Sequence, residues 1–234
     1  MADPLVDITE LARSFGGRTV IDRLTMRLDP GMMIGLVGAN GGGKTTSLRM
    51  IAGLLAPDRG NGTVLGVPVE RSGMRPGLGY MPQRLSLYPE LTVRENLRFR
   101  VSVHAGNSQQ ALDEAIDRWG LASVVDQRFD RLSGGWGRRV QFAATMIGAP
   151  RLLLLDEPTA GLDVVTRRLI WQWLAAFTAS GGGVIISTHD LAEAGACPQI
   201  IHYHGGEARG PIRPADLIRE LGVATLEDAV AQLA

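Results

Sequence analysis

The stretch Gly38-Ala-Asn-Gly-Gly-Gly-Lys44-Thr45-Thr46 decides the fold of this chain. It matches the GxxxxGK[ST] pattern of a phosphate-binding loop, in which glycines expose backbone N–H groups, an ammonium reaches the β- and γ-phosphates and a hydroxyl binds Mg²⁺. Lys44 is the only lysine in the sequence, and the wide planar fork of an arginine would not fit the same position. The loop therefore predicts binding of a nucleoside triphosphate together with Mg²⁺.

The segments on either side of the loop have the order that such a loop requires. Residues 32–37 form a short apolar run that predicts a buried strand, and residues 46–55 have the apolar spacing of a helix. A strand, a glycine loop and a helix start place a phosphate at the positive end of the helix. The loop pattern alone would arise by chance about once in a hundred chains of this length, so we interpret it as functional.

The composition is ordinary for a soluble globular protein, with 234 residues, 45% hydrophobic and 21% charged residues and a formal net charge of +0. A balanced charge gives no electrostatic footprint for nucleic acid, so no nucleic-acid partner is expected. The sequence has no apolar run of about 18 residues and no signal-peptide pattern at its start, which predicts a cytoplasmic protein. The single cysteine, Cys197, is expected in the core.

Strand and helix patterns alternate along the rest of the chain. Residues 5–30 alternate apolar and polar positions around a Phe15-Gly16-Gly17 turn, which predicts an antiparallel hairpin at a sheet edge. Residues 54–80 predict short strands joined by turns, and residues 92–126 predict an insertion of helices with a polar break at 106–110.

Two later apolar runs, 151–155 and 183–188, predict fully buried strands, and helical patterns precede and follow the first of them at 133–150 and 164–178. Strands that alternate with helices indicate a parallel sheet. The predicted fold is therefore α/β: a P-loop NTPase core with a mainly parallel sheet, an N-terminal antiparallel β-subdomain and an inserted α-helical subdomain.

Acidic and imidazole side chains follow the two buried strands. Asp156 and Glu157 come directly after the first, at the carboxyl edge of the sheet where ligands of α/β proteins collect. Together with the phosphate loop, this placement assigns Mg²⁺ binding to Asp156 and the orientation or deprotonation of the attacking water to Glu157. His189 follows the second strand and is expected to donate a hydrogen bond near the γ-phosphate.

A second anion-binding pattern lies at Leu132-Ser133-Gly134-Gly135-Trp136, where a serine and two glycines open a helix. One nucleotide does not need two such sites within one subunit. We therefore expect a second copy of the chain, turned head to tail, to close its Ser133 site over the triphosphate held by the first.

With these motifs in order, the chain resembles the nucleotide-binding subunits of the ATP-binding cassette family over essentially its full length. The resemblance adds Gln83 as the glutamine loop, 160–163 as the D-loop, and Phe15 as an aromatic that stacks on adenine. It implies an ATPase with the following site residues: catalytic Glu157, His189 and Gln83; nucleotide-binding Phe15, Gly38, Asn40, Gly41, Gly42, Gly43, Lys44, Thr45, Thr46, Ser133, Gly134, Gly135 and Asp163; Mg²⁺-binding Thr45, Gln83 and Asp156.

The chain departs from the family at Trp136, where members most often carry glutamine. Because Ser133 and Gly135 remain, we expect altered closure of the dimer and retained ATPase activity.

The resemblance further implies a transporter subunit that is peripheral on the cytoplasmic face of the membrane and works with a separate integral membrane permease. Residues 1–234 would form a single ATPase domain with a helical subdomain at about 85–145, whose Tyr88, Leu91 and Val93 are candidate permease contacts, and a short tail at about 205–234. Residues 225–230 resemble the closing helix of export-type subunits. The alternatives are a soluble cassette ATPase of translation or DNA repair and a nucleotide-binding regulatory module without turnover.

Overall fold

The computed structural model describes residues 3–73, 75–105 and 108–233, and within them ten strands form one curled sheet in the order β5-β4-β1-β2-β10-β9-β3-β8-β7-β6. The strands are β1 Val6–Phe15, β2 Arg18–Leu28, β3 Met33–Gly38, β4 Arg59–Val64, β5 Val67–Pro68, β6 Leu78–Met81, β7 Leu152–Asp156, β8 Gly183–Thr188, β9 Gln199–His204 and β10 Glu207–Ile212. The sheet combines a parallel and an antiparallel part, so the predicted α/β class is confirmed.

The parallel part consists of β6, β7, β8, β3 and β9, in which each strand pairs in parallel with its neighbour. Every residue of β3, β7 and β8 is buried, because helices and other strands cover both faces. Leu153 and Leu155 of β7 pack into one apolar cluster, whereas Leu152 and Leu154 pack into a second cluster on the opposite face. Strand alternation thus builds two cores from one run of leucines.

The predicted hairpin forms between β1 and β2, with Gly16 and Gly17 at its turn in left-handed conformation. Its predicted position at the sheet edge is wrong, because β4 pairs with the outer side of β1 and β5 lies outside β4. The strand β4 contains two glycines in six residues, so its sequence lacks the alternation from which this pairing could be read.

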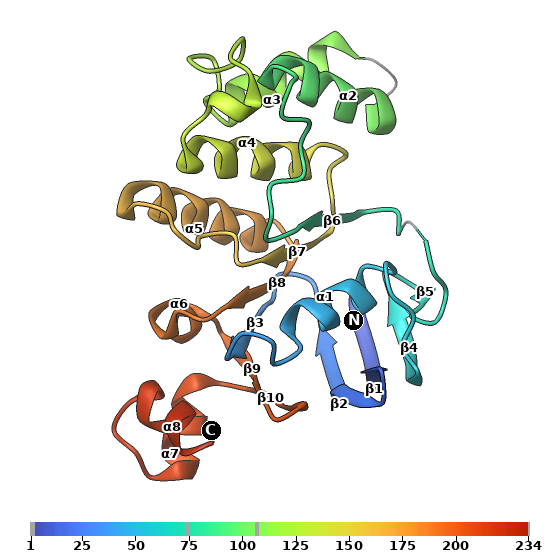
Figure 1. Ribbon diagram of the computed structural model, residues 1–234, viewed down its shortest axis with the longest axis vertical. Helices are drawn as coiled ribbons and strands as arrows, with labels where there is room; N and C mark the ends of the chain where they lie inside the picture. Colours follow the sequence, from blue (N-terminus) through green and yellow to red (C-terminus); the bar gives the residue numbers. More distant parts are fainter. Residues whose placement is uncertain (1–2, 74, 106–107, 234) are drawn as a thin grey trace.

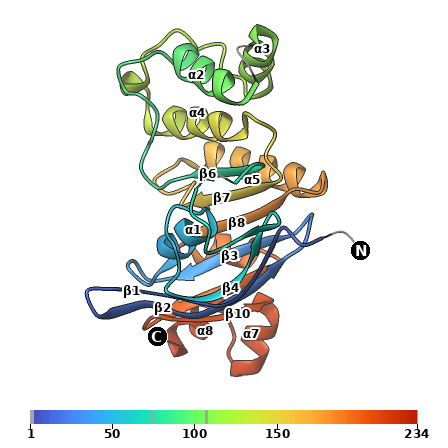
Figure 2. The same cartoon turned by 90° about the vertical axis from the view of Figure 1, so that its right-hand side faces the viewer.

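The helices are α1 Lys44–Ile51, α2 Val93–Ala105, α3 Gln109–Arg118, α4 Gly134–Met146, α5 Val164–Ala179, α6 Leu191–Ala196, α7 Pro214–Leu221 and α8 Leu226–Gln232, with a 3-10 turn at Phe129–Arg131. Figures 1 and 2 show α2, α3 and α4 stacked at one end of the molecule and α7 with α8 at the other. In the part of the chain that the structure describes, no helix is long and apolar enough to cross a membrane.

The predicted helical insertion is present as α2 and α3, and residues 106–107 of the predicted polar break lie outside the described residues. An aromatic cluster joins this insertion to the core. Trp119, after α3, lies edge-on to both Phe142 of α4 and Trp173 of α5, at 5.4 and 4.8 Å between ring centroids. The helix α4, which Ser133 caps, and Trp119 after α3 are therefore packed directly on α5 of the parallel core.

Candidate active site

The glycine loop turns sharply between β3 and α1, and its glycines have conformations that other residues rarely adopt. Gly38, Gly41 and Gly43 have φ angles of 145°, 79° and 107°. A Cβ atom at Gly38 would lie 2.3 Å from the Tyr203 carbonyl oxygen. Glycine is therefore required for the close approach of the loop to β9, as well as for its turn.

Lys44 opens α1 and points back into this loop. Its Nζ donates hydrogen bonds to the carbonyl oxygens of Gly38 at 2.6 Å and Ala39 at 3.0 Å. Burial lowers the pKa of Lys44, while the charges of Glu157 and Asp156 raise it. The ammonium is thus held over the mouth of the loop, close enough to two carboxylates to interact with them electrostatically.

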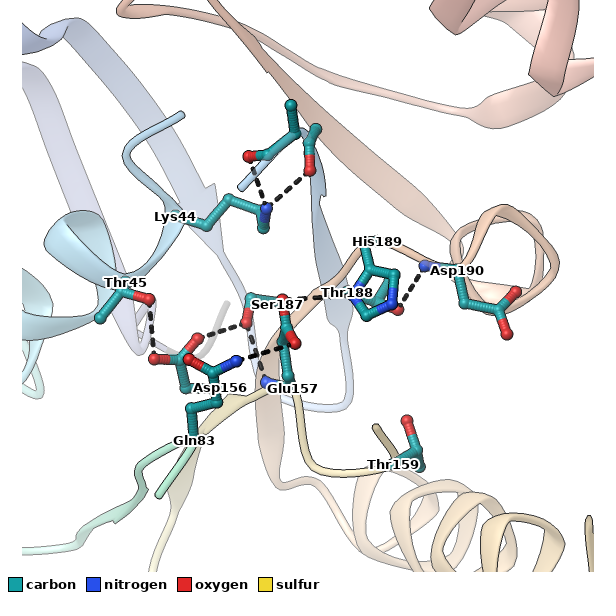
Figure 3. A network of polar contacts seen from close by, with 12 residues as sticks. Lys44, Thr45, Gln83, Asp156, Glu157, Thr159, Ser187, Thr188, His189 and Asp190 are labelled. Atoms are coloured by element: carbon teal, nitrogen blue, oxygen red, sulfur yellow. Dashed lines mark hydrogen bonds and ion pairs between the residues drawn. The ribbon is translucent and has the colours of Figure 1, made fainter. Parts of the chain in front are cut away.

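Thr45, in the first turn of α1, contacts Asp156 at the end of β7. The Thr45 hydroxyl donates to Asp156 Oδ2 at 2.8 Å, and the Ser187 hydroxyl donates to Asp156 Oδ1 at 2.6 Å (Figure 3). Asp156 is buried, so both carboxylate oxygens are held in fixed positions. A hydroxyl and a carboxylate are the hard oxygen ligands that Mg²⁺ prefers, so this donor pair fits the predicted ion.

Glu157 lies next to this pair in a strained backbone conformation with φ of 47°, which is uncommon for a residue with a side chain. Its Oε2 accepts a hydrogen bond from Gln83 Nε2 at 3.1 Å, and its Oε1 lies 3.3 Å from His189 Nδ1. Figure 3 shows the three side chains converging from three different strand ends. The structure thus brings together Glu157, His189 and Gln83, the three residues expected to be catalytic.

A cavity of about 330 Å³ opens beside these residues, lined by Asn40, Gly41, Gly43, Lys44, Thr45, Thr46, Gln83 and Glu157. The lining combines loop residues at a helix N-terminus with one buried cation and one carboxylate. A larger depression of about 440 Å³ lies between α3 and the end of α4, but its lining includes none of the residues of the loop or the carboxyl edge. We take the smaller cavity as the candidate active site because it holds the chemically distinctive groups.

The Ser133 motif stands apart from this cavity. Ser133 caps α4 by accepting a hydrogen bond from Trp136 N–H at 3.4 Å, and Ser133 and Gly134 are exposed. None of residues 132–136 lines the cavity of the phosphate loop. The two anion-binding patterns are therefore separate surfaces of one chain.

Asp163 and Phe15, two predicted nucleotide contacts, interact with residues of their own chain. Asp163 caps α5, where its carboxylate accepts hydrogen bonds from the N–H groups of Val165 and Thr166 at 2.9 and 3.0 Å. The backbone bond from Thr166 contributes most to lowering the pKa of Asp163. Phe15 is exposed at the end of β1, with the Arg13 guanidinium 4.9 Å from its ring centroid. An exposed aromatic ring and an adjacent positive charge therefore lie together at the end of β1.

The side chain of Trp136 contacts Arg139, one helical turn further along α4. The Arg139 guanidinium lies 4.8 Å from the Trp136 ring centroid and 5.7 Å from that of Trp173, and its Nε donates to the Trp119 carbonyl oxygen. The indole that replaces the usual glutamine is therefore part of the packing between α4 and α5.

Two functional neighbours were not predicted from the sequence. Ser187 links the Asp156 carboxylate to the main chain of Glu157, since its hydroxyl donates to Asp156 Oδ1 and accepts from the Glu157 backbone N–H at 3.0 Å. Arg138 donates to the carbonyl oxygens of Pro82 and Gln83. Asp156 of β7 pairs with Ser187 of β8, so a known strand register would have identified Ser187. The register between two strands cannot be predicted from the sequence of either strand alone.

The predicted permease contacts divide into exposed and buried residues. Tyr88 is 50% exposed and packs edge-on against Phe99, whereas Val93 is 0% exposed and belongs to the core. Val93 is therefore wrong as a surface contact, because it opens α2 with its side chain turned inward. Phe99, which was not predicted, is exposed and in contact with Tyr88, and Leu85, three residues before Tyr88 in the chain, is exposed as well.

Comparisons with known proteins agree with this site. A family model described as ABC transporter matches residues 21–160, and one described as an AAA domain matches residues 128–194. Nod factor export ATP-binding protein I of Rhizobium etli is 40% identical over 222 residues, which cover 92% of this chain and 70% of that protein. The "Probable multidrug ABC transporter ATP-binding protein YbhF" of Escherichia coli is 36% identical over 221 residues, which cover 92% of this chain and 38% of that protein.

A solved structure described as the ATP binding subunit of an ABC transporter has the same fold. It aligns with a TM-score of 0.86 at 26% identity and covers 98% of this chain and 99% of that chain.

Proposed function

The chain belongs to the ATP-binding cassette transporter family as an ATP-binding subunit, and from this membership we propose that it hydrolyses ATP with Mg²⁺ to power export through a separate membrane permease. One observation carries the proposal. The structure brings Lys44, the Thr45–Asp156 pair and the Gln83–Glu157–His189 cluster together beside one cavity. The comparisons give no support to the alternative of a cassette ATPase of translation or DNA repair.

ATP binds with its phosphates over the glycine loop in this proposal. The loop N–H groups and Lys44 neutralise the β- and γ-phosphates, and Thr45, Asp156 and Gln83 hold Mg²⁺. The remaining residues of the predicted nucleotide site in this copy are Phe15, Gly38, Asn40, Gly41, Gly42, Gly43 and Thr46. Bound Mg²⁺ would supply positive charge that lowers the barrier to phosphoryl transfer.

Glu157 orients and deprotonates the attacking water. Its two carboxylate oxygens are held by Gln83 and His189, so its position is fixed before ATP arrives. His189 then donates a hydrogen bond toward the γ-phosphate as charge develops there. The strained backbone at Glu157 supports this role, because strain of this kind is concentrated at functional sites.

A second copy of the chain completes the site. Ser133, Gly134 and Gly135 are proposed to cover the triphosphate bound by the partner copy, with Asp163 at the same interface. The support is that the Ser133 motif is exposed and lines no part of its own chain's cavity. ATP then closes the dimer because it contacts both copies only in the closed state.

The permease is proposed to contact the exposed side chains of Tyr88, Leu85 and Phe99, of which Leu85 and Tyr88 follow Gln83 closely in the chain. Export as the direction rests on the relatives, one named for Nod factor export and one for multidrug transport. Residues 1–234 would act as one ATPase domain on the cytoplasmic face of the membrane, with the helical subdomain at about 85–145 and the tail at about 205–234.

The test is phosphate release by the purified chain and by the Glu157→Gln variant. Wild type is expected to hydrolyse ATP with Mg²⁺, and Glu157→Gln to bind ATP while turning over about 10²- to 10⁴-fold more slowly, the usual contribution of a general base. The variant is also expected to accumulate as an ATP-bound dimer in size-exclusion chromatography. Equal turnover in both proteins would remove Glu157 from the role, and a variant that stays monomeric at saturating ATP would refute the proposed dimer.

The Lys44→Ala variant separates binding from catalysis. It is expected to lose tight ATP binding in calorimetry, because it removes the cation that faces the phosphates. Co-purification of the wild-type chain with an integral membrane protein tests the transport assignment, and co-sedimentation with ribosomes or DNA would argue against it.

A further inference from the structure

A buried carboxylate outside the cluster described above connects the segments that carry Glu157 and His189. Glu193, in the first turn of α6, is 6% exposed. Its Oε2 accepts hydrogen bonds from the hydroxyls of Thr159 and Thr188, each at 2.9 Å. A single buried oxygen thus holds two hydroxyls from chain segments 29 residues apart.

Each of the two threonines lies close in the chain to one of the candidate catalytic residues. Thr159 lies two residues after Glu157, and Thr188 lies immediately before His189. Both threonines are buried, and the Thr188 hydroxyl also accepts the N–H of Asp190 at 3.0 Å (Figure 3). The carboxylate of Glu193 therefore fixes the distance between the backbones that carry Glu157 and His189.

Arg167 holds the second oxygen of the same carboxylate. Its Nε lies 3.6 Å from Glu193 Oε1, and its Nη1 donates to Asp190 Oδ2 at 2.8 Å. Arg167 stands in the first turn of α5, directly after the segment that ends in the Asp163 cap. The α5 N-terminus is therefore joined through Glu193 to both threonines.

The Arg167–Glu193 contact is looser than the others. Arg167 Nε is buried and makes no hydrogen bond within the described residues, because 3.6 Å is longer than a normal N–H···O bond. A small cavity of about 60 Å³ is lined by Arg167 and Glu193 together with Glu157 and His189. The Arg167–Glu193 pair and the two candidate catalytic side chains therefore border the same space.

We propose that Glu193 is a positioning residue for the hydrolysis reaction, which sets the geometry of Glu157 and His189 through Thr159 and Thr188 and is itself held by Arg167. The inference rests on the proposed ATPase site. A buried carboxylate that satisfies two buried hydroxyls makes a rigid connection, since each unmade bond would leave a buried polar group without a partner. Displacing a general base by about 1 Å costs about 100-fold in rate.

A purely structural role for Glu193 predicts a different result. If the carboxylate only stabilises the fold, its loss lowers the melting temperature and leaves the turnover of the folded protein unchanged. If it positions Glu157, its loss lowers kcat and leaves the ATP dissociation constant unchanged, because Lys44 and Thr45 are not in contact with this network.

The experiment measures kcat, KM, the ATP dissociation constant and the melting temperature of four variants. Thr159→Val removes the hydroxyl and keeps the shape, and Thr159→Ser keeps the hydroxyl and removes a methyl group. Glu193→Ala removes the acceptor, and the double variant Thr159→Val/Glu193→Ala tests whether the two residues act through one another. Glu220→Gln is the matched control, since Glu220 of α7 makes an exposed ion pair with Arg209 of β10.

Glu193→Ala is expected to lose about 10- to 100-fold in kcat, and Thr159→Val about 10-fold, with the ATP dissociation constant within about twofold of wild type. Thr159→Ser is expected to restore kcat, and the double variant to lose no more than Glu193→Ala alone. If Glu193→Ala does not fold, the comparison of Thr159→Val with Thr159→Ser tests the same connection, because both variants leave Glu193 in place.

Unchanged kcat in Thr159→Val and in the Glu193 variant would overturn the inference while leaving the ATPase assignment intact. Equal losses in Thr159→Val and Thr159→Ser would also overturn it, because packing would then explain the effect. A wild-type chain without ATP hydrolysis would instead overturn the proposed function, and this inference with it.

Discussion

Arg138, in the second turn of α4, donates a hydrogen bond to the main-chain carbonyl of Gln83, whose side chain in turn donates to Glu157. The same guanidinium bonds the Pro82 carbonyl at 3.3 Å, and Gln141 Nε2 bonds it at 3.2 Å. The helix that begins at the Ser133 motif is thus fixed to the glutamine loop of its own chain. Separation of the two segments would break these hydrogen bonds.

Replacement of Arg138 by methionine tests this connection. Arg138→Met is expected to lower kcat about 10-fold with little change in ATP affinity, because Gln83 loses the bond that holds its backbone in place. The measurements are steady-state phosphate release and ATP titration. Arg98→Met, at an exposed position on α2, is the control and is expected to match wild type. If both variants behave alike, the bond to Gln83 contributes nothing to turnover.

Gly43 is expected to be irreplaceable by alanine. Its φ is 107°, and an added Cβ would lie 2.2 Å from Ile21 Cδ1 and 2.8 Å from the Val20 carbonyl oxygen. Gly43→Ala is therefore expected to lose ATP binding and about 2 kcal/mol or more of unfolding free energy. Urea denaturation and nucleotide titration measure the two effects.

The control for Gly43→Ala is Gly195→Ala in α6, where an added Cβ meets nothing within 4 Å. This variant is expected to be neutral or more stable by up to about 1 kcal/mol, because alanine favours helix more than glycine does. ATP binding by Gly43→Ala at wild-type affinity would show that the loop can relax around the added methyl group.

Arg75 is expected to be important for stability alone. Its buried guanidinium donates to the carbonyl oxygens of Ile51, Val67, Pro68, Val69 and Arg71. Lysine cannot reproduce this fork of donors, so Arg75→Lys is expected to lose about 3 kcal/mol of unfolding free energy while the folded protein keeps its kcat. Arg71→Lys, whose side chain is exposed, should be close to wild type. Denaturant unfolding would contradict the idea if the two variants lost equal stability.

The candidate site residues could be brought together from the sequence because their positions follow from strand ends. Lys44, Asp156 and His189 each follow a run of buried apolar residues, and the carboxyl ends of parallel strands meet at one edge. Side chains that bridge strands were not predicted. Ser187 and Glu193 have no motif of their own, since their roles depend on the strand register and on which way α6 turns after Asp190.

The errors at Val93 and at the hairpin edge have related causes. Val93 follows an exposed loop, and one residue at a helix start does not reveal which face it occupies. Residues 54–80 predict short strands but not which strand they pair with, because β4 contains two glycines in six residues and lacks the alternation that would indicate a pairing with the hairpin. In both cases a tertiary contact determined the outcome where local periodicity was uninformative.

Cys197 provides a test of burial that is independent of ATP. Burial raises the pKa of the Cys197 thiol to about 12 from its ordinary 9.0, with a further contribution from the charge of Glu193. The native thiol is therefore expected to resist alkylation and disulfide exchange at pH 8, and to react once the protein is unfolded in urea. Rapid reaction of the native protein would show that the region around α6 opens readily.

The same shift predicts a pH dependence of stability. Above about pH 9 the unfolded thiol loses its proton while the folded thiol keeps it, so the unfolded state binds fewer protons and stability falls as pH rises toward about 12. Each pH unit in this window costs up to about 1.4 kcal/mol. Because other groups also titrate there, the measurement is the difference in unfolding free energy between wild type and Cys197→Ala. A difference that stays constant from pH 8 to pH 11 would contradict the raised pKa, since only Cys197 distinguishes the two proteins.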